Sequence, residues 1–486
     1  MFHIRPIALV IGIMLTTLGS AMILPILLDL AADNHDWQAF FASAALTLFV
    51  GIALIFVGRE PEGNGRTELN IRDAFLLTTA SWVVMAVFAA LPFILADIEL
   101  NYTDAFFEAM SGLTTTGSTV ISGLDRMPPG ILMWRALLQW LGGIGIIVTA
   151  VAVLPMLQIG GMQLFRAESF ETLGKLLPRA AQIAAVITVF YVTFSSICAI
   201  AYWFSGMSGF DAAAHAMSTI STGGFSTYDS SIAYFDSPAI ESITILFMII
   251  GSSPFMLYWK MIDDDPWCYF RDSQVRGFLG LLAVSTGILT IYQWLSEANE
   301  GLTALRHAAF NVVSIVTGTG YATTDYALWG SFSVAMFFFL MFCGGCSGST
   351  SCSIKIFRLQ VLYLSAMTQI KRVMLPHGVF HTRYNGQPLP DTAALSVKSF
   401  FFLFVLSFGM VALILALLGL DYITAISAAA TAITNVGPGL GPIVGPAGNF
   451  TTMPASAKWV LSGAMLLGRL ELFTVLVLFL PRFWRG

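Results

Sequence analysis

The chain has 486 residues, of which 57% are hydrophobic and only 10% are charged. Soluble domains contain about 25% charged residues, so this composition excludes an ordinary globular enzyme and indicates an integral membrane protein. The formal net charge of -5 is less informative than where the charges lie along the chain. The five cysteines all lie in or beside apolar segments, which argues against a disulfide framework.

The first apolar run follows Arg5 and continues to about Leu28. It is longer than the core of a signal peptide, so we expect an uncleaved first helix. A membrane span needs about 20 apolar residues, and this measure predicts an all-α fold with ten transmembrane helices. They are expected near 6–29, 38–58, 74–97, 131–156, 182–205, 238–260, 276–296, 331–356, 399–420 and 457–480.

Four shorter apolar segments are too short to cross a membrane, and this length is typical of re-entrant helices. They lie near 103–116, 209–221, 303–317 and 421–434. Each runs into a loop that contains glycine, at 114–119, 221–226, 317–322 and 434–439. The unit of span, short helix, glycine loop and span therefore occurs four times, which is a repeat signal.

The repeats predict a pseudo-fourfold, K⁺-channel-like arrangement in which four M1-P-M2 units surround a central path. We expect two extra N-terminal transmembrane helices in residues 1–60 and repeats at 61–170, 171–270, 271–385 and 386–486. With the N-terminus inside, most of the 23 Lys and Arg residues fall in cytoplasmic segments, where they accumulate in membrane proteins. The glycine loops are thus expected to face the cell exterior, with both termini cytoplasmic.

The loops have the chemistry of an ion filter. Glycine leaves the backbone free to turn its carbonyl groups toward a central axis, and rings of carbonyl oxygens replace the hydration shell of K⁺. Either Gly223 or Gly224 fits the centre of the second loop, and aligning Gly-Phe225 with Gly-Tyr321 favours Gly224. A single loop of this kind is more often a packing device or helix break, but four copies in one context favour a filter. Its predicted residues are Thr115, Thr116, Gly117, Thr222, Gly223, Gly224, Gly318, Thr319, Gly320, Asn435, Val436 and Gly437.

Three carboxylates lie at or near the starts of the short helices, namely Asp104, Asp211 and Asp421. A carboxylate at this position caps the free backbone N–H groups of a helix. We also expect these groups to make the outer vestibule acidic, which raises the local cation concentration.

Residues 343–353 contain no large side chain, although they lie in the middle of the predicted eighth span. We predict irregular backbone that projects into the cavity below the filter and acts as a gate. The predicted gate residues are Gly344, Gly345, Gly348, Ser349, Thr350 and Lys355, together with Arg469. Close packing against a neighbouring helix is an alternative. A metal site at Cys343, Cys346 and Cys352 is another, although this spacing fits no common structural zinc pattern.

Arg469 and Glu471 fall inside the predicted last span, where a charge is costly and marks a functional candidate. Arg469 is expected to meet the polar stretch of the eighth span or to repel cations at a closed gate. A purely structural pairing with the backbone or with Glu471 is the alternative. Residues two apart do not face one another on a helix, so separate partners are favoured.

Several segments together resemble the Trk-type potassium-uptake proteins of bacteria, in the superfamily that includes the Ktr and plant HKT proteins. They are Asp104–Glu108 running into Leu113–Gly117, Gln139–Val148, Gly160–Glu168, Gly223–Thr227, Asn435–Gly441 and Gly468–Glu471. The resemblance covers nearly the whole chain. It departs at Ser351-Cys352-Ser353, where the family pattern usually continues with glycines, and at Gly318, where the family often has Thr.

The resemblance implies a K⁺ filter built on one glycine per repeat and a gate formed by the broken helix at 344–354, with Arg469 as its partner. It also implies a homodimer and cytosolic nucleotide-binding regulatory subunits of the RCK or TrkA type, for which the basic segment 355–398 is a suitable docking place.

We therefore expect K⁺ uptake across the bacterial plasma (inner) membrane, with K⁺ as the transported ion. No tightly bound cofactor, nucleic-acid partner or enzyme activity is expected. An H⁺- or Na⁺-coupled cation symporter is the alternative, and Glu471 is the clear acidic residue at membrane depth that such coupling would use.

Overall fold

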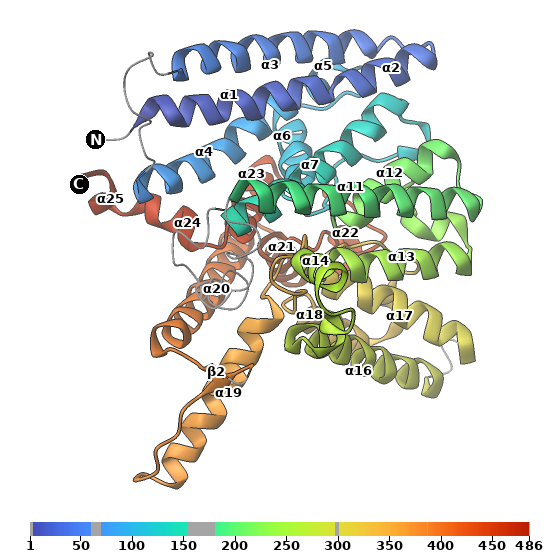
Figure 1. The fold of residues 1–486 in the computed structure, drawn as a ribbon. Coiled ribbons are helices and arrows are strands. Elements are labelled where there is room, and N and C mark those ends of the chain that lie inside the picture. Colours follow the sequence, from blue (N-terminus) through green and yellow to red (C-terminus); the bar gives the residue numbers. More distant parts are fainter. Residues whose placement is uncertain (1–2, 60–69, 153–179, 297–300, 386, 486) are drawn as a thin grey trace.

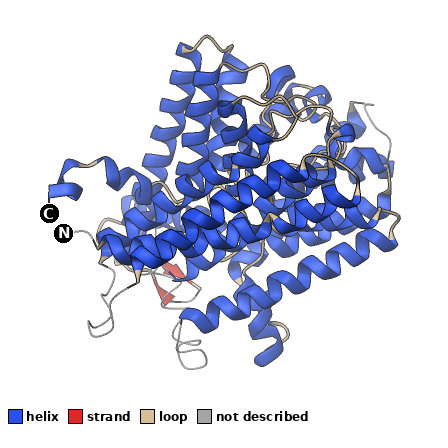
Figure 2. Ribbon diagram, turned by 90° about the horizontal axis from the view of Figure 1, so that it is seen from above, coloured by secondary structure: helices blue, strands red, loops and turns tan. Residues whose placement is uncertain are grey.

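The structure is a computed structural model that describes residues 3–485, apart from 60–69, 153–179, 297–300 and 386. Its described residues are mostly helical, as Figures 1 and 2 show. The strands β1 (Arg383–Tyr384) and β2 (Gln387–Pro388) form one short antiparallel hairpin, in which Arg383 lies opposite Pro388. The expected all-α class is thus observed in these residues. The motif at 160–168 lies outside them.

Two N-terminal helical arms pack closely against each other. They are α1 (Ile4–Ala21), which continues as α2 (Ile23–Ala31), and α3 (Trp37–Gly58). A Cβ placed on Gly12, Gly51 or Gly58 would lie within 3.0 Å of the backbone of the facing helix. Small residues let apolar helices approach at this distance, which explains why α1 and α3 run side by side along one flank of the molecule (Figure 1).

The remaining helices follow the order expected for the four repeats, whose exact bounds stay a prediction. The first group contains α4 (Ile71–Ala89), α5 (Leu91–Leu95), α6 (Tyr102–Leu113), η1 (Leu124–Arg126) and α7 (Pro129–Ala152). The second contains α11 (Ala180–Phe204), α12 (Gly209–Ile220), η3 (Ser231–Phe235), α13 (Pro238–Gly251) and α14 (Phe255–Asp263). The third contains α15 (Cys268–Arg271), α16 (Ser273–Leu295), α17 (Gly301–Thr317), η4 (Tyr326–Trp329), α18 (Ser331–Leu340) and α19 (Ile356–Met374). The fourth contains α20 (Asp391–Leu417), α21 (Tyr422–Thr434), α22 (Gly441–Val444), α23 (Ala455–Arg469), α24 (Phe473–Leu476), η5 (Val477–Phe479) and α25 (Pro481–Arg485).

The four short helices are α6, α12, α17 and α21. Side chains of Asn101, Ser208 and Asp421 cap the starts of α6, α12 and α21. The expectation that Asp104 and Asp211 are the caps is therefore wrong for these two residues, because both lie inside the first helical turn and the caps precede them. Hydrogen bonds from Thr424 lower the pKa of the Asp421 carboxyl below its usual value.

Among the described residues, seven helices are long and apolar enough to cross a membrane, or nine if each of two bent helix pairs is one span. The predicted eighth span at 331–356 is the ten-residue helix α18 followed by irregular backbone. The number of ten spans thus stays a prediction.

Two further predicted spans are bent helix pairs and not continuous helices. The chain bends by 87° between α13 and α14 and by 113° after α23. At the first bend, Pro254 has no N–H to continue the helix. At the second, Glu471 and Leu472 have φ angles of 61° and 46°, which end a right-handed helix. Arg469 is therefore the last residue of α23 and not a position inside an unbroken span.

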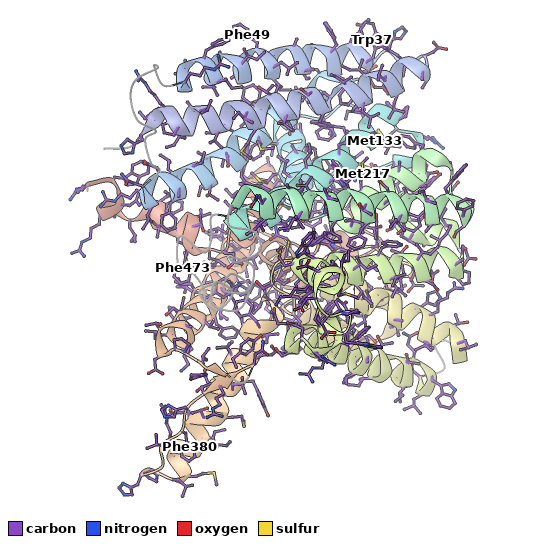
Figure 3. The ribbon with its side chains drawn as sticks, in the orientation of Figure 1. Trp37, Phe49, Met133, Met217, Phe380 and Phe473 are labelled. Carbon is purple, nitrogen blue, oxygen red and sulfur yellow. The ribbon has the colours of Figure 1, made fainter. Side chains whose placement is uncertain are left out.

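Large apolar side chains cover the outer faces of the long helices. Phe49 on α3, labelled in Figure 3, is 71% exposed, and Leu417 at the end of α20 is 86% exposed. Exposed apolar belts of this kind are typical of lipid-facing surfaces. Helix α19 and the hairpin beside it project away from the other helices (Figure 1).

Candidate functional site

The four glycine loops contact one another in a closed cycle. A Cβ placed on Gly117 would lie within 3.0 Å of the carbonyl oxygen of Gly223, in the second loop. In the same way, a Cβ placed on Gly224 would lie within 3.0 Å of the carbonyl oxygen of Thr319, in the third loop. A Cβ on Gly320 would lie within 3.0 Å of the carbonyl oxygen of Val436, in the fourth loop. Gly437 returns to the first loop, at the carbonyl oxygen of Thr116. Each loop therefore presents one carbonyl group to the glycine of the loop before it.

The φ angles give one register for all four loops. The glycines at 117, 224, 320 and 437 have φ angles of 84°, 79°, 82° and 103°. Two residues earlier, Thr115, Thr222, Gly318 and Asn435 also have positive φ angles, from 50° to 76°. Gly224 is thus the structural equivalent of the other three glycines. Gly318 takes without strain the left-handed conformation that costs energy at the other three positions.

Polar side chains join the loops to each other. The Asn435 amide donates to the hydroxyl of Thr116 at 2.9 Å and to the carbonyl of Met465 at 2.9 Å. The Ser118 hydroxyl donates to the Gly437 carbonyl at 2.9 Å. The first and fourth loops are therefore held together from both sides of their contact. The Thr hydroxyls hold loop conformation and are themselves paired, as between Thr317 and Thr319 at 2.8 Å.

Next to these loops, residues 341–355 between α18 and α19 are almost entirely irregular. The segment uses backbone groups freed by the bend after α13: the N–H groups of Cys346 and Thr350 donate to the carbonyls of Ser252 and Gly251, at 2.9 and 3.1 Å. The two breaks in helical structure thus satisfy each other's hydrogen bonds, as buried backbone requires. Among predicted gate residues, Gly348 has a φ of 76° and its carbonyl accepts from Phe255 at 3.1 Å.

The irregular segment lies against all four glycine loops. Thr350 lies 3.2 Å from Thr222, hydroxyl to hydroxyl, and the Cys352 thiol lies 3.9 Å from the Thr115 hydroxyl. The Ser353 hydroxyl donates to the carbonyl of Thr434 at 3.1 Å. A Cβ placed on Gly318 would lie 3.6 Å from the Cys352 nitrogen. We call residues 343–354 the inner loop.

Ser351, Cys352 and Ser353 make specific contacts within and around the inner loop. The Ser351 hydroxyl accepts a hydrogen bond from the Gly345 N–H at 2.9 Å. Ser353 has a φ of 60°, and its single O–H is shared between the Thr434 carbonyl and the Met341 carbonyl, which lies 2.7 Å away. Together with Cys352, these side chains restrain the inner loop where glycines would leave it free.

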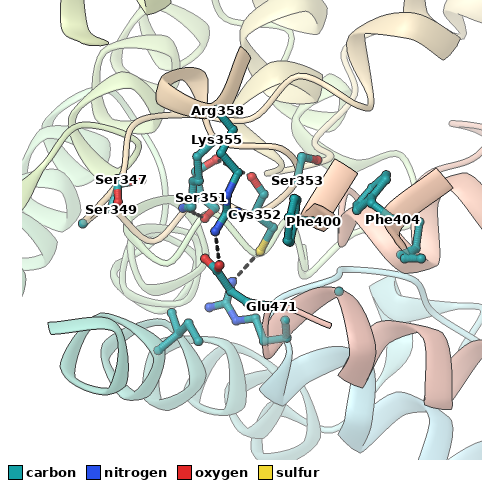
Figure 4. Close-up of a pocket in the computed structure, with 15 residues that line it drawn as sticks. Ser347, Ser349, Ser351, Cys352, Ser353, Lys355, Arg358, Phe400, Phe404 and Glu471 are labelled. Atoms are coloured by element: carbon teal, nitrogen blue, oxygen red, sulfur yellow. Dashed lines mark hydrogen bonds and ion pairs between the residues drawn. The ribbon is translucent and has the colours of Figure 1, made fainter. Parts of the chain in front are cut away.

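Arg469 is buried against the inner loop. Its guanidinium donates to the carbonyls of Thr350 at 3.1 Å and Gly142 at 3.3 Å, and it contacts the thiol of Cys352. Glu471 instead pairs with Arg358 on α19, so Arg469 and Glu471 have separate partners, as their spacing indicates. The Lys355 ammonium donates to the Ser351 carbonyl. Figure 4 shows Cys352, Lys355, Arg358 and Glu471 around one cavity beside the inner loop. The cavity is also lined by Phe400, whose ring lies 3.9 Å from the Arg358 guanidinium.

Residues 36–485 match the model of the TrkH family, described as a cation transport protein. The chain belongs to this family.

Relatives of the TrkH family match over almost the full length. The chain is 44% identical to the Trk system potassium uptake protein TrkI of Halomonas elongata, covering 99% of this chain and 97% of the relative. It is 39% identical to the Trk system potassium uptake protein TrkH of Escherichia coli, covering 99% and 100%. The crystal structure of the potassium transporter TrkH from Vibrio parahaemolyticus aligns over 100% of both chains with a TM-score of 0.91 and 37% identity. The predicted family is confirmed, and with its apolar helices the chain is an integral membrane protein.

Three residues outside the predicted site residues support the loops, namely Arg135, Glu108 and Gln139. Arg135 on α7 is buried, pairs with Glu108 at 2.8 Å and donates to the Ser226 carbonyl at 2.7 Å. Gln139, one helical turn further, contacts the second loop. A charged residue inside the predicted span at 131–156 is the signal that points to Arg135, since charges in spans are rare.

The cavity at the four glycine loops is less acidic than the predicted outer vestibule. The cavity that contains the four glycines is lined by Arg135 and Asp229 among its charged side chains, and Asp104, Asp211 and Asp421 do not line it in the described part of the chain. Asp104 is paired with Lys458 at 2.5 Å, and Asp211 accepts from the Thr227 hydroxyl at 2.7 Å. These carboxylates stabilise the helix starts and the adjoining loops through ion pairs and hydrogen bonds. Within the described residues, no group of three His, Cys, Asp or Glu side chains could hold a metal ion, including at the inner-loop cysteines.

Proposed function

We propose that this protein takes up K⁺ across the bacterial plasma membrane through a central pore, with the four glycine loops as its selectivity filter. The observation that carries this proposal is the closed cycle in which the carbonyls of Thr116, Gly223, Thr319 and Val436 each meet the glycine of a neighbouring loop. A ring of backbone carbonyls is the chemistry that replaces the hydration shell of K⁺. The naming of the relatives as potassium uptake proteins supports the same ion.

The inner loop is the proposed gate. It lies against the inner side of the filter and is tied there by Thr350, Cys352 and Ser353. Arg469 adds a buried positive charge beside this loop, which opposes the passage of a cation while the loop is in place. Opening requires that the loop leave the filter and that Arg469 exchange its partners.

The proposed topology has ten spans, with the filter loops outside and both termini in the cytoplasm. Lys371 and Arg372 end the projecting helix α19 and place basic charge on the proposed cytoplasmic side. This element and the hairpin after it are the proposed docking place for cytosolic nucleotide-binding regulatory subunits. The proposed assembly is a homodimer.

A coupled H⁺ or Na⁺ symporter is less well supported. Glu471, the acidic residue that such coupling would use, is engaged in an ion pair with Arg358. Coupling by a carboxylate requires that it bind and release an ion during each cycle, which would leave the buried guanidinium without this partner.

Ion flux into liposomes that contain the purified protein tests the proposal. We expect K⁺ uptake down its gradient with slower Na⁺ uptake, and unitary currents in planar bilayers. Equal K⁺ and Na⁺ fluxes would contradict the filter, and strictly pH-driven or Na⁺-driven flux without unitary currents would favour the symporter.

A further inference from the structure

One side chain outside the four loops is bound directly to the predicted filter. Gln139 lies on α7 and is fully buried. Its amide nitrogen Nε2 donates to the carbonyl of Gly223 at 2.6 Å, and its Oε1 accepts from the backbone N–H of Phe225 at 3.0 Å. The two bonds bracket Gly224, so one planar amide holds the backbone on both sides of the central glycine.

The second loop needs such an external support more than its neighbours do. The position of Gly223 is occupied by Thr116, Thr319 and Val436 in the other loops. The Thr116 hydroxyl hydrogen-bonds to Thr114 at 2.7 Å, and the Thr319 hydroxyl to Thr317 at 2.8 Å. Gly223 has no side chain, and with Gly224 it forms a pair of glycines, the most flexible dipeptide available.

Space as well as flexibility explains the glycine at 223. A Cβ placed on Gly223 would lie within 3.0 Å of three atoms of the Gln139 amide group. The amide therefore occupies the place that a side chain takes in the other loops. The second loop has no side chain of its own at this position, and the Gln139 amide from the neighbouring helix α7 makes the stabilising contacts instead.

The carbonyl that Gln139 binds is one of the four in the cycle. The Gly223 carbonyl is the group that faces Gly117 across the contact of the first and second loops. A hydrogen bond at 2.6 Å fixes the direction of this carbonyl and draws on its lone pairs. Both effects change how strongly the oxygen can replace water around an ion, and so how well the ring distinguishes ions of different size.

We propose that Gln139 is a positioning residue that sets ion selectivity by fixing the Gly223 carbonyl in the second loop. The proposal rests on the assignment of the four loops as the filter. Gln139 acts through the backbone of the loop and does not itself bind the ion.

Two substitutions separate the two hydrogen bonds. Gln139→Leu removes both, whereas Gln139→Glu keeps the shape and an acceptor for the Phe225 N–H but replaces the donor to Gly223. Removing a hydrogen bond of ordinary strength predicts a fall of about fivefold in the ratio of K⁺ to Na⁺ flux for Gln139→Leu. Gln139→Glu should lower the ratio as well, because the carboxylate repels the carbonyl that the amide attracts.

The measurement is the K⁺, Rb⁺ and Na⁺ flux of each purified variant in liposomes, expressed as ratios within one variant. A purely structural role would lower all three fluxes in proportion and leave the ratios unchanged. The matched control is Gln293→Leu, since Gln293 is also a fully buried glutamine but lies on α16, outside the four glycine loops and α7. Size-exclusion chromatography selects folded protein, and where Leu prevents folding, Gln139→Glu supplies the ratio.

The outcomes distinguish this proposal from the filter assignment on which it rests. A lowered ratio in the Gln139 variants, with an unchanged ratio in Gln293→Leu, supports the proposal. Gly224→Ala changes the filter glycine itself. If Gly224→Ala lowers the ratio and the Gln139 variants do not, the proposal is overturned while the filter stands. If none of these variants changes the ratio, the filter assignment has failed.

Discussion

The hydroxyl of Thr222, in the second glycine loop, hydrogen-bonds to the hydroxyl of Thr350 in the inner loop, at 3.2 Å. The Thr350 hydroxyl also donates to the carbonyl of Gly251 at 2.8 Å, and the carbonyl of Ile220 at the end of α12 lies 3.1 Å away. One side chain thus joins the proposed gate, the bend after α13 and the second glycine loop. In this conformation, the inner loop cannot leave without releasing its hydrogen bond to the second glycine loop.

Thr350→Val keeps the shape of the side chain and removes these hydrogen bonds. We expect a less stable closed loop and a K⁺ flux through purified protein that is raised about fivefold, from the loss of roughly 1 kcal/mol. Thr188→Val is the control, because the Thr188 hydroxyl bonds only to the Ala184 carbonyl within α11 in the described structure. A flux equal to that of the unmodified protein would show that Thr350 does not hold the gate closed.

Gly437→Ser tests the ring itself. A Cβ at this position would lie within 3.0 Å of the Thr116 carbonyl oxygen, and the φ of 103° is unfavourable for any side chain. The fourth loop must shift, so we expect a K⁺-to-Na⁺ flux ratio lowered by about tenfold, with backbone strain on the order of 1–3 kcal/mol.

The comparison for Gly437→Ser is Gly463→Ser on α23. A Cβ on Gly463 has nothing within 4 Å, so this control adds the same atoms without a clash. Relative ion permeability is measured in liposomes for both variants. A ratio in Gly437→Ser that matches the control would place the filter elsewhere.

Arg469→Ala removes the cation beside the inner loop and its bonds to Thr350 and Gly142. Hydrogen bonds from a charged group contribute about 1.5–3 kcal/mol, so we expect open probability in single-channel records to rise on the order of tenfold. The K⁺-to-Na⁺ permeability ratio should stay unchanged, because Arg469 does not touch the ring carbonyls in the described structure. Loss of selectivity with normal gating would assign Arg469 to the filter instead.

Glu471→Gln leaves the guanidinium of Arg358 without its carboxylate partner. Breaking a buried ion pair by removing one partner costs about 3–5 kcal/mol, although the ring of Phe400 retains its contact with Arg358. We therefore expect a lower midpoint of thermal unfolding, measured by the loss of monodisperse protein on heating. The double variant Arg358→Met with Glu471→Gln should recover much of this loss. An unchanged midpoint in the single variant would show that the pair contributes little.

Local sequence patterns were sufficient for much of the fold. Runs of about 20 apolar residues predicted the seven long helices, and short apolar runs before glycines predicted α6, α12, α17 and α21. The positions of the glycines predicted the four loops and the irregular segment at 343–353. These features depend on hydrophobicity and backbone freedom over a few neighbouring residues, which a sequence displays directly.

The tertiary structure alone decided how these parts meet. Three relationships join residues that are far apart in the chain. They are the cyclic contact of the glycine loops, the ion pair of Glu471 with Arg358, and the hydrogen bond of Gln139 to Gly223. The sequence does not predict the bend after Arg469, because the apolar residues on both sides of it suit a straight helix. The left-handed backbone at Glu471 and Leu472 ends α23 there. Such contacts arise from packing and hydrogen bonding between separate elements, which local composition does not encode. For the glycine loops, the sequence specified four flexible turns, and the packing of the surrounding helices brought a carbonyl of each loop against the glycine of a neighbouring loop.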